Sequence, residues 1–191
     1  MKTATQQGDL LLMRRKNITA EMMKEYMVDA LILLMQEKPY HEITIGQITD
    51  KAGVNRSTYY RNFQSKEEIV KRFYCRILEQ GVSRVSNPDT IGLESYLSLM
   101  FHTFFEQKDA LLSIHGGGLS YLLLDALNRH FSVYQKLEQS AFTDKIPLYY
   151  HTGGIFNTFL LWFDYNMEPT PEEFVKAALA VYPPKQRPML L

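Results

Sequence analysis

Seven consecutive residues, Arg56 to Asn62, carry the side chains in this sequence that are best suited to reading a nucleic acid. They comprise two arginines, two tyrosines, a serine, a threonine and an asparagine. Arginine can donate two parallel hydrogen bonds to a guanine edge, while hydroxyl and amide groups can bond to bases or phosphates. On two turns of helix, these side chains are typical of a segment that reads DNA in the major groove. The alternative is an ordinary helical hairpin with a polar exposed face.

Two short helices separated by a tight turn are predicted to hold these side chains. Thr44 is expected to be the first N-cap, because its hydroxyl can accept a hydrogen bond from a first-turn amide. An apolar face follows at helical spacing, formed by Ile45, Ile48 and Ala52. Gly53 stands where this helix must end, since glycine takes a left-handed conformation without steric cost. Asn55 can cap the next helix, and two helices joined by a short glycine turn form the helix-turn-helix pattern.

The second helix is expected to turn an aromatic side inward and a polar side outward. Tyr59 and Phe63 lie four residues apart and therefore share one face. The residues predicted to point outward are Arg56, Thr58, Arg61 and Asn62.

A third helix is predicted to begin after Ser65, with Glu68 three residues on at the spacing of a capping box. Lys66 falls in the first turn, where a positive charge opposes the helix dipole. A phosphate lying across the helix N-terminus would favour both the lysine and the first-turn amides. We therefore expect Lys66 to contact a DNA phosphate.

Residues 43–73 resemble the DNA-binding domain of the TetR family of bacterial transcriptional regulators. The family pattern is matched here by Thr44, Ile48, Ala52, Gly53, Val54, Asn55, Thr58, Tyr60, Phe63, Lys66 and Ile69. Asn55 replaces the family's serine and Ile69 its leucine, and both changes are conservative. The resemblance implies an all-α protein, in which a three-helix DNA-binding domain precedes a helical-bundle regulatory and dimerisation domain. It also places Thr44 at a phosphate-facing position.

The remaining DNA contacts are predicted residue by residue. Arg56 is expected to bind O6 and N7 of a guanine. Thr58 and Asn62 are expected to touch a base or its neighbouring phosphate, and Tyr60 and Lys66 to hold phosphates that set the register. The full predicted set is Thr44, Arg56, Ser57, Thr58, Tyr60, Arg61, Asn62 and Lys66.

A second resemblance covers most of residues 90–182. One TetR subgroup, which includes a regulator of dihydroxyacetone-kinase genes, carries a glycine pair before a long helix and a later Gly-Gly segment followed by tryptophan. That later segment appears here as Gly153, Gly154 and Trp162. The resemblance leaves open whether the regulatory domain binds a metabolite or a protein partner.

Composition and charge fit a cytoplasmic globular protein. Hydrophobic residues make up 46% of the 191 residues, and the net charge is zero. Residues 1–80 carry a net charge of +3 and the rest −3, which places a weakly positive end where DNA is expected. Cys75 is the only cysteine, so an intramolecular disulfide is excluded, and we expect it in the core. No apolar stretch is long enough for a signal peptide or a membrane span.

The expected organisation has five parts. These are a flexible N-terminal arm over 1–16, a helix-turn-helix DNA-binding domain over 17–64, a connecting helix over 65–86, a regulatory and dimerisation domain over 87–182 and a proline-rich tail over 183–191. The first long helix is expected to begin after Thr19 and to end before Pro39. The basic triplet over 14–16 belongs either to a disordered leader or to an arm on DNA. The best domain boundary is the break over 87–89.

The helix expected over 146–166 is apolar on more than one face, which predicts burial. We expect it to pair with its mate in a twofold homodimer, together with the last helix, for which Thr170 is the predicted cap. The predicted interface residues are Gly153, Gly154, Phe159, Trp162 and Phe174. The alternative is a monomer with a central buried helix.

A dimer would hold two recognition helices on successive major grooves, about 34–36 Å apart. The expected function is a dimeric repressor released from a palindromic double-stranded operator by a small-molecule effector. The alternative is a coactivator whose C-terminal domain binds a protein partner. The effector would lie among Phe101, His102, Phe105, Tyr121, Tyr150 and Phe156, which otherwise simply form core.

No cofactor, metal or catalytic activity is expected. The five histidines show no metal-ligand spacing. The glycine triplet over 116–118 lacks the lysine and hydroxyl residue of a Walker loop, and no G-x-S-x-G elbow is present.

Overall fold

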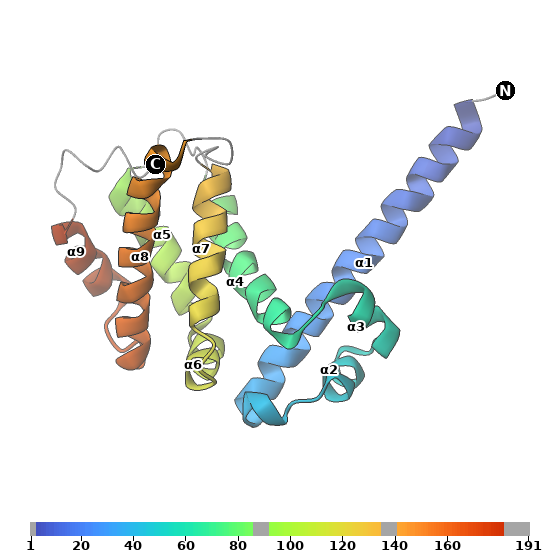
Figure 1. The fold of residues 1–191 in the computed structure, drawn as a ribbon, viewed down its shortest axis with the longest axis horizontal. Helices are drawn as coiled ribbons and strands as arrows, with labels where there is room; N and C mark the ends of the chain where they lie inside the picture. Colours follow the sequence, from blue (N-terminus) through green and yellow to red (C-terminus); the bar gives the residue numbers. More distant parts are fainter. Residues whose placement is uncertain (1–2, 86–91, 135–140, 182–191) are drawn as a thin grey trace. The chain divides into compact units, whose positions relative to one another are not determined.

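The computed structural model describes residues 3–85, 92–134 and 141–181, and throughout these ranges the regular structure is helical (Figure 1). The predicted all-α fold class is therefore confirmed. The chain divides into two compact units, Met1–Ile69 and Val70–Leu191. This division falls inside a helix, close to the predicted end of the DNA-binding domain at residue 64. The predicted break over 87–89 and the predicted tail over 183–191 lie outside the described residues.

The first unit is built on a long helix, α1 (Thr3–Glu37), which packs against α2 (Ile45–Ala52) and α3 (Arg56–Asn62). Its core includes Met27, Leu31, Ile48 and Tyr59, each at most 1% exposed. The sequence predicted a flexible arm over 1–16 and a helix start near Thr19, but α1 begins at Thr3. Residues 3–18 contain no proline and many good helix formers, so nothing in their sequence forces the helix to start later.

The turn elements between α1 and α3 follow from local hydrogen bonds. A short 3₁₀ helix, η1 (Tyr40–Glu42), follows Pro39. Thr44 then caps α2 in a complete capping box: its Oγ1 accepts from the Gln47 amide at 3.2 Å, and its amide donates to Gln47 Oε1 at 3.0 Å. Gly53 ends α2 with φ of 67°, as predicted. Asn55 occupies the N-cap position of α3 but makes no side-chain capping bond.

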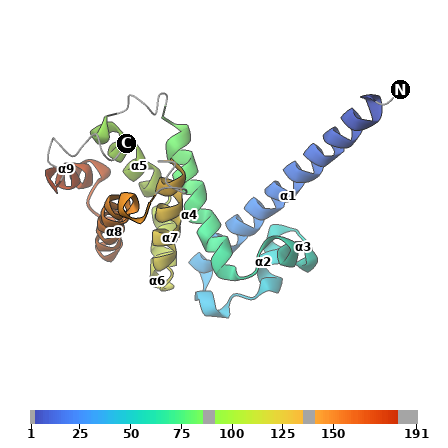
Figure 2. The same cartoon turned by 45° about the horizontal axis from the view of Figure 1, so that its top comes forward.

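The second unit is a helical bundle. Its helices are most of α4 (Lys66–Ser83), then α5 (Leu93–Phe105), α6 (Lys108–Gly116), α7 (Tyr121–Tyr134), α8 (Phe142–Asp164) and α9 (Pro171–Val181). Helix α5 packs on α9, and α7 packs along α8 (Figure 2). Cys75, on α4, is partly buried, and this burial raises the pKa of its thiol.

An aromatic cluster joins α5, α8 and α9. The Phe101 ring lies 4.5 Å from that of Phe174 and 5.9 Å from that of Trp162, while Phe104 lies 4.4 Å from Phe159. The indole nitrogen of Trp162 donates to the Pro169 carbonyl at 2.8 Å, which satisfies its only polar group.

The cap of α9 is a second complete capping box. The Glu173 amide donates to Thr170 Oγ1 at 3.3 Å, and the Thr170 amide donates to Glu173 Oε2 at 2.9 Å. The predicted cap is therefore confirmed, and it fixes where α9 begins against the aromatic cluster.

Candidate nucleic-acid interface

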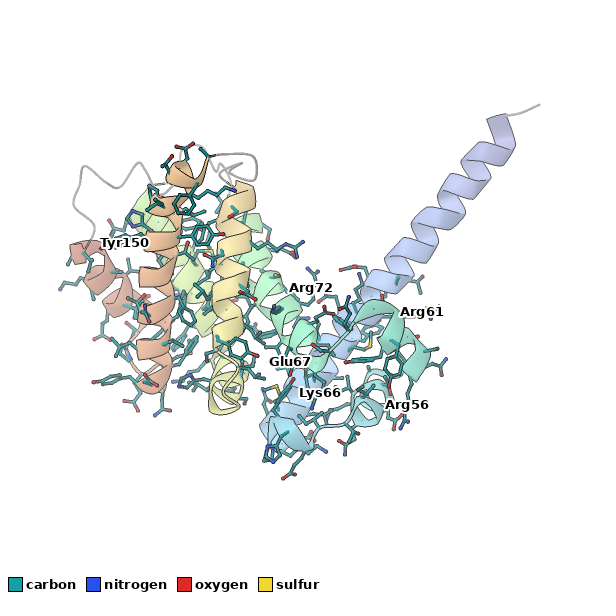
Figure 3. The ribbon with its side chains drawn as sticks, in the orientation of Figure 1. Arg56, Arg61, Lys66, Glu67, Arg72 and Tyr150 are labelled. Atoms are coloured by element: carbon teal, nitrogen blue, oxygen red, sulfur yellow. The ribbon has the colours of Figure 1, made fainter. Side chains whose placement is uncertain are left out.

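Helix α3 has an exposed polar edge and a buried aromatic face, which we call the aromatic anchor and which consists of Tyr59 and Phe63. Tyr59 and Phe63 are 1% and 6% exposed, so the predicted inward face is confirmed. Arg56, Ser57, Tyr60 and Arg61 are all exposed. Tyr60 is 67% exposed, and its ring stands edge-on to that of Tyr59 at 5.2 Å. Figure 3 labels Arg56 and Arg61 on α3, and both arginines lie on the exposed edge, as predicted.

Thr58 departs from the predicted outward orientation. It is only 4% exposed, so it lies on a covered flank of α3 and not on its outer edge. Its Oγ1 accepts from Arg61 Nη2 at 3.3 Å, and its carbonyl accepts from Asn62 Nδ2 at 2.6 Å. Asn62 is accordingly half-buried rather than fully outward. Both residues stabilise α3 from within, and the predicted outward direction of Thr58 was wrong.

Arg56 lies against the first turn of α2. A Cβ built on Gly46 would stand 2.5 Å from Arg56 Nη2, so the guanidinium covers this glycine. Among the described residues, no hydrogen-bond acceptor engages the Arg56 guanidinium. This contact was missed at the sequence level. The signal was a glycine inside a helix pattern, which often marks a close approach of another group.

Lys66 does not point outward as a phosphate contact would. Its Nζ donates to the Ile43 carbonyl at 2.7 Å and to the Tyr40 carbonyl at 3.0 Å. The ammonium also lies 4.3 Å from the centre of the Tyr40 ring. Burial lowers the pKa of Lys66, which Glu67 partly offsets. The positive charge in the first turn of α4 is thus explained by acceptors within the protein.

The start of α4 also differs from the predicted capping box. Glu68 Oε2 accepts from the Gln64 amide at 2.6 Å, one residue earlier than the predicted cap, Ser65. Hydrogen bonds to Glu67 from its own backbone amide, and from the side chains of Ser65 and Tyr40, lower the pKa of that carboxyl. Two acidic side chains therefore satisfy amides at the N-terminal end of α4.

This part of the sequence matches a known protein family. The sequence profile of the bacterial regulatory proteins of the tetR family matches residues 28–73, which span the end of α1, all of α2 and α3, and the start of α4. Residues 28–73 therefore form a domain of the TetR type.

A similar protein extends the likeness beyond the matched residues. The HTH-type dhaKLM operon transcriptional activator DhaS of Lactococcus lactis subsp. lactis (strain IL1403) is 26% identical over 98 residues, which are 51% of this chain and 49% of that protein. The chain thus matches about half the length of this curated relative.

Solved structures share the fold of the chain. The dihydroxyacetone kinase operon activator DhaS has a TM-score of 0.56 at 19% identity, over 83% of this chain and 94% of that one. The fatty acid degradation regulator FadR from Bacillus halodurans has a TM-score of 0.51 at 17% identity, over 83% and 93%. At these identities the likeness establishes the fold alone.

The residues predicted to bind an effector differ in their contacts and in their exposure. Phe101 belongs to the aromatic cluster, and the Phe105 ring is stacked on Trp162 at 6.0 Å. His102 Nε2 lies 3.1 Å from Glu172 Oε1. The others differ in exposure: Phe156 is half-buried, Tyr121 is 56% exposed and Tyr150 is 79% exposed.

The predicted dimer residues divide into two groups. Phe159 and Trp162 are 3% and 1% exposed within the chain itself, and Phe174 packs on Phe101 and Trp162. Phe159 and Trp162 therefore belong to the core of one subunit, and the prediction that these two residues face a partner was wrong. Phe174 is half-buried, and its place in a dimer interface stays a prediction. Gly154 is exposed and Gly153 is half-buried, with no atoms where a Cβ would stand.

A polar chain in the second unit was not predicted. His115 Nδ1 lies 3.0 Å from Ser120 Oγ, and His115 Nε2 lies 3.0 Å from Asp164 Oδ1. Serine, histidine and aspartate together resemble a hydrolytic triad, but Ser120 is 6% exposed and bonds to the ring nitrogen opposite to the usual one. At this exposure Ser120 is covered from solvent. The polar chain links α6 and α8 to the turn that precedes α7.

Across residues 3–85, 92–134 and 141–181, no helix is both long and apolar enough to cross a membrane. In the same described ranges, no group of three histidine, cysteine or acidic side chains is arranged to hold a metal ion.

Proposed function

We propose that this protein is a DNA-binding transcriptional regulator whose helix α3 enters the major groove. The observation that carries the proposal is the exposed polar edge of α3, held on the buried rings of Tyr59 and Phe63. A recognition helix needs both properties, since its polar edge must meet the bases while the opposite face stays fixed to the domain. The family match over residues 28–73 supports the same function.

The contacts are assigned by exposure and chemistry. Arg56 reads a guanine edge with its bidentate guanidinium, and Ser57 lies beside it at the start of α3. Tyr60 and Arg61 reach base edges or phosphates from the next turn. Thr44 lies at the N-terminus of α2, where first-turn amides and the helix dipole favour a phosphate.

The regulator acts as a homodimer that joins through α8. The outer face of α8 carries apolar side chains at helical spacing on both sides of Gly153 and Gly154. These side chains are between 51% and 79% exposed: Ile146, Tyr149, Tyr150 and Leu161. Burying such a face is favourable at roughly 25 cal/mol per Å² of apolar surface, and Gly153 and Gly154 allow a second helix to come close. A twofold dimer binds a palindromic operator, because each subunit presents the same helix to one half-site.

The regulatory outcome we propose first is repression relieved by a small-molecule effector. A second candidate is activation, with the C-terminal domain binding a protein partner. It is favoured by the likeness to DhaS, which is described as an operon activator both as a curated relative and as a solved structure. A reporter under the operator separates them, because deleting a repressor raises expression and deleting an activator lowers it.

Fluorescence anisotropy with a labelled duplex tests DNA binding itself. We expect affinity to fall steeply between about 50 and 200 mM salt, as phosphate contacts release counterions. The double variant Arg56→Ala/Arg61→Ala should lose most of this binding while keeping its helical content. A folded double variant with wild-type affinity would overturn the assignment of α3.

A further inference from the structure

The acceptors that hold Lys66 lie in one short stretch of backbone. The Tyr40 carbonyl belongs to η1, and the Ile43 carbonyl directly precedes Thr44, the cap of α2. Ile43 is 2% exposed, so its carbonyl cannot rely on bulk water for a hydrogen bond. The Lys66 ammonium supplies that bond from the first residue of α4. One side chain thus fixes the junction between η1 and α2.

The Tyr40 side chain lies at the same junction. Its hydroxyl helps to lower the pKa of the Glu67 carboxyl, and its ring faces the Lys66 ammonium. Lys66 therefore contacts Tyr40 at both its ring and its carbonyl. Figure 3 labels Lys66 and Glu67 together at this end of α4. A shift of α4 at this point would move the backbone that leads into α2.

We propose that Lys66 is a positioning residue for DNA binding, which sets the N-terminus of α2 by holding the Ile43 and Tyr40 carbonyls, and that it does not itself bind a phosphate. The proposal rests on the proposed DNA-binding function. The group positioned is the first turn of α2, which begins at the Thr44 cap that we assign to a DNA phosphate. Charge at Lys66 matters because a charged donor holds a buried carbonyl more strongly than a neutral one.

Salt dependence distinguishes the two roles of Lys66. In Lys66→Met the stem remains but the charge is lost. A positioning role predicts that affinity falls about tenfold or more, while the slope of log affinity against log salt stays unchanged. A phosphate contact predicts that the slope becomes shallower by about 0.9, because one fewer counterion is released. The second result would overturn the proposal.

A double-mutant cycle with Tyr40→Leu provides a readout that a general loss of stability would not give. If Lys66 acts through the η1–α2 junction, the losses in DNA affinity for Lys66→Met and Tyr40→Leu are strongly non-additive. If Lys66 binds phosphate and Tyr40 is only structural, the two losses add. Urea unfolding first identifies a temperature at which every variant is folded. The DNA affinities are then compared at that temperature.

If Lys66→Met fails to fold, a measurement on the wild-type protein tests the proposal instead. The ¹⁵Nζ resonance of Lys66 is recorded with and without a bound duplex. The proposal predicts nearly the same chemical shift in both states, because the ammonium keeps its carbonyl partners, whereas a large shift on binding overturns it. Failure of the proposed function has a different signature, since the wild-type protein then binds no duplex in the anisotropy assay.

Discussion

The guanidinium of Arg56 covers Gly46, so closely that a Cβ on this residue would stand 2.5 Å from Nη2. Arg56 opens α3 and Gly46 lies in the first turn of α2, so this contact joins the two helices of the turn motif. Only glycine leaves room for the guanidinium at this place. The position of the side chain that we assign to a base edge therefore depends on a residue in the neighbouring helix.

Gly46→Ala should separate stability from recognition. Alanine is favoured over glycine in a helix by roughly 0.5–1 kcal/mol, and the group it displaces is the far end of an exposed side chain. We expect the melting temperature to stay the same or to rise slightly. Operator affinity should fall, because the Arg56 guanidinium can no longer pack against position 46. Thermal unfolding and anisotropy measure the two effects. A variant with reduced stability and unchanged affinity would show that the contact is irrelevant to binding.

Arg56→Ala should weaken operator binding by about 1–3 kcal/mol and relax the preference at one base pair in each half-site. The reason is the loss of a bidentate guanine contact. Binding to a set of duplexes, each with one base pair changed, measures the preference. Arg129→Ala is the matched control, because it removes an exposed arginine from α7. Equal weakening across all duplexes would place Arg56 on phosphate instead.

Phe159→Ala should destabilise the protein by about 3–5 kcal/mol, because it opens a cavity in the aromatic cluster. Phe159 is 3% exposed and packs on Phe104 with 4.4 Å between ring centres. Leu161, two residues along α8 and 56% exposed, provides the control. Its replacement by alanine should leave urea unfolding of the subunit nearly unchanged. A larger loss for Leu161→Ala would mean that the inner and outer faces of α8 are assigned the wrong way round.

Tyr150→Glu should convert the homodimer to a monomer. Tyr150 is 79% exposed on the outer face of α8, and a charge there would be buried without a partner in the dimer. Light scattering at micromolar concentration is expected to give the mass of a dimer for the wild type. Tyr121→Glu, at an exposed site on α7, should leave that mass unchanged. A monomeric wild-type protein would refute the dimer directly.

His130 should make the protein less stable as the pH falls below about 6.5. Burial lowers the pKa of His130 in the folded state, so between the two pKa values the unfolded chain binds a proton that the folded chain does not. Stability is therefore unaffected above the unfolded pKa and decreases on acidification through this range. Melting temperatures from pH 8 to 5 should fall less for His130→Gln than for the wild type. Parallel curves for the two proteins would exclude this histidine as the cause.

Local features were the ones predictable from the sequence. The N-caps at Thr44 and Thr170 and the left-handed Gly53 each depend on residues within three or four positions of one another. The inward face of α3 followed from the spacing of Tyr59 and Phe63. Such features follow from helix geometry and backbone chemistry, so no knowledge of the tertiary structure was needed.

Contacts between distant residues could not be predicted in the same way. Lys66 and Ile43 are separated by 23 positions, and His115 and Asp164 by 49. The local sequence around a lysine in the first turn of a helix does not reveal whether its partner is a phosphate or a carbonyl. Thr58 was assigned outward because helical spacing alone does not reveal which flank of α3 is covered.

Selection of bound sites from a pool of random duplexes tests the central claim most directly. The account predicts that the wild-type protein enriches an inverted repeat with half-site centres about one helical turn, or somewhat more, apart. It also predicts a guanine in each half-site that Arg56→Ala no longer selects. A pool that stays random after repeated rounds, at low salt and with folded protein, would contradict the account of α3 as a DNA-reading helix.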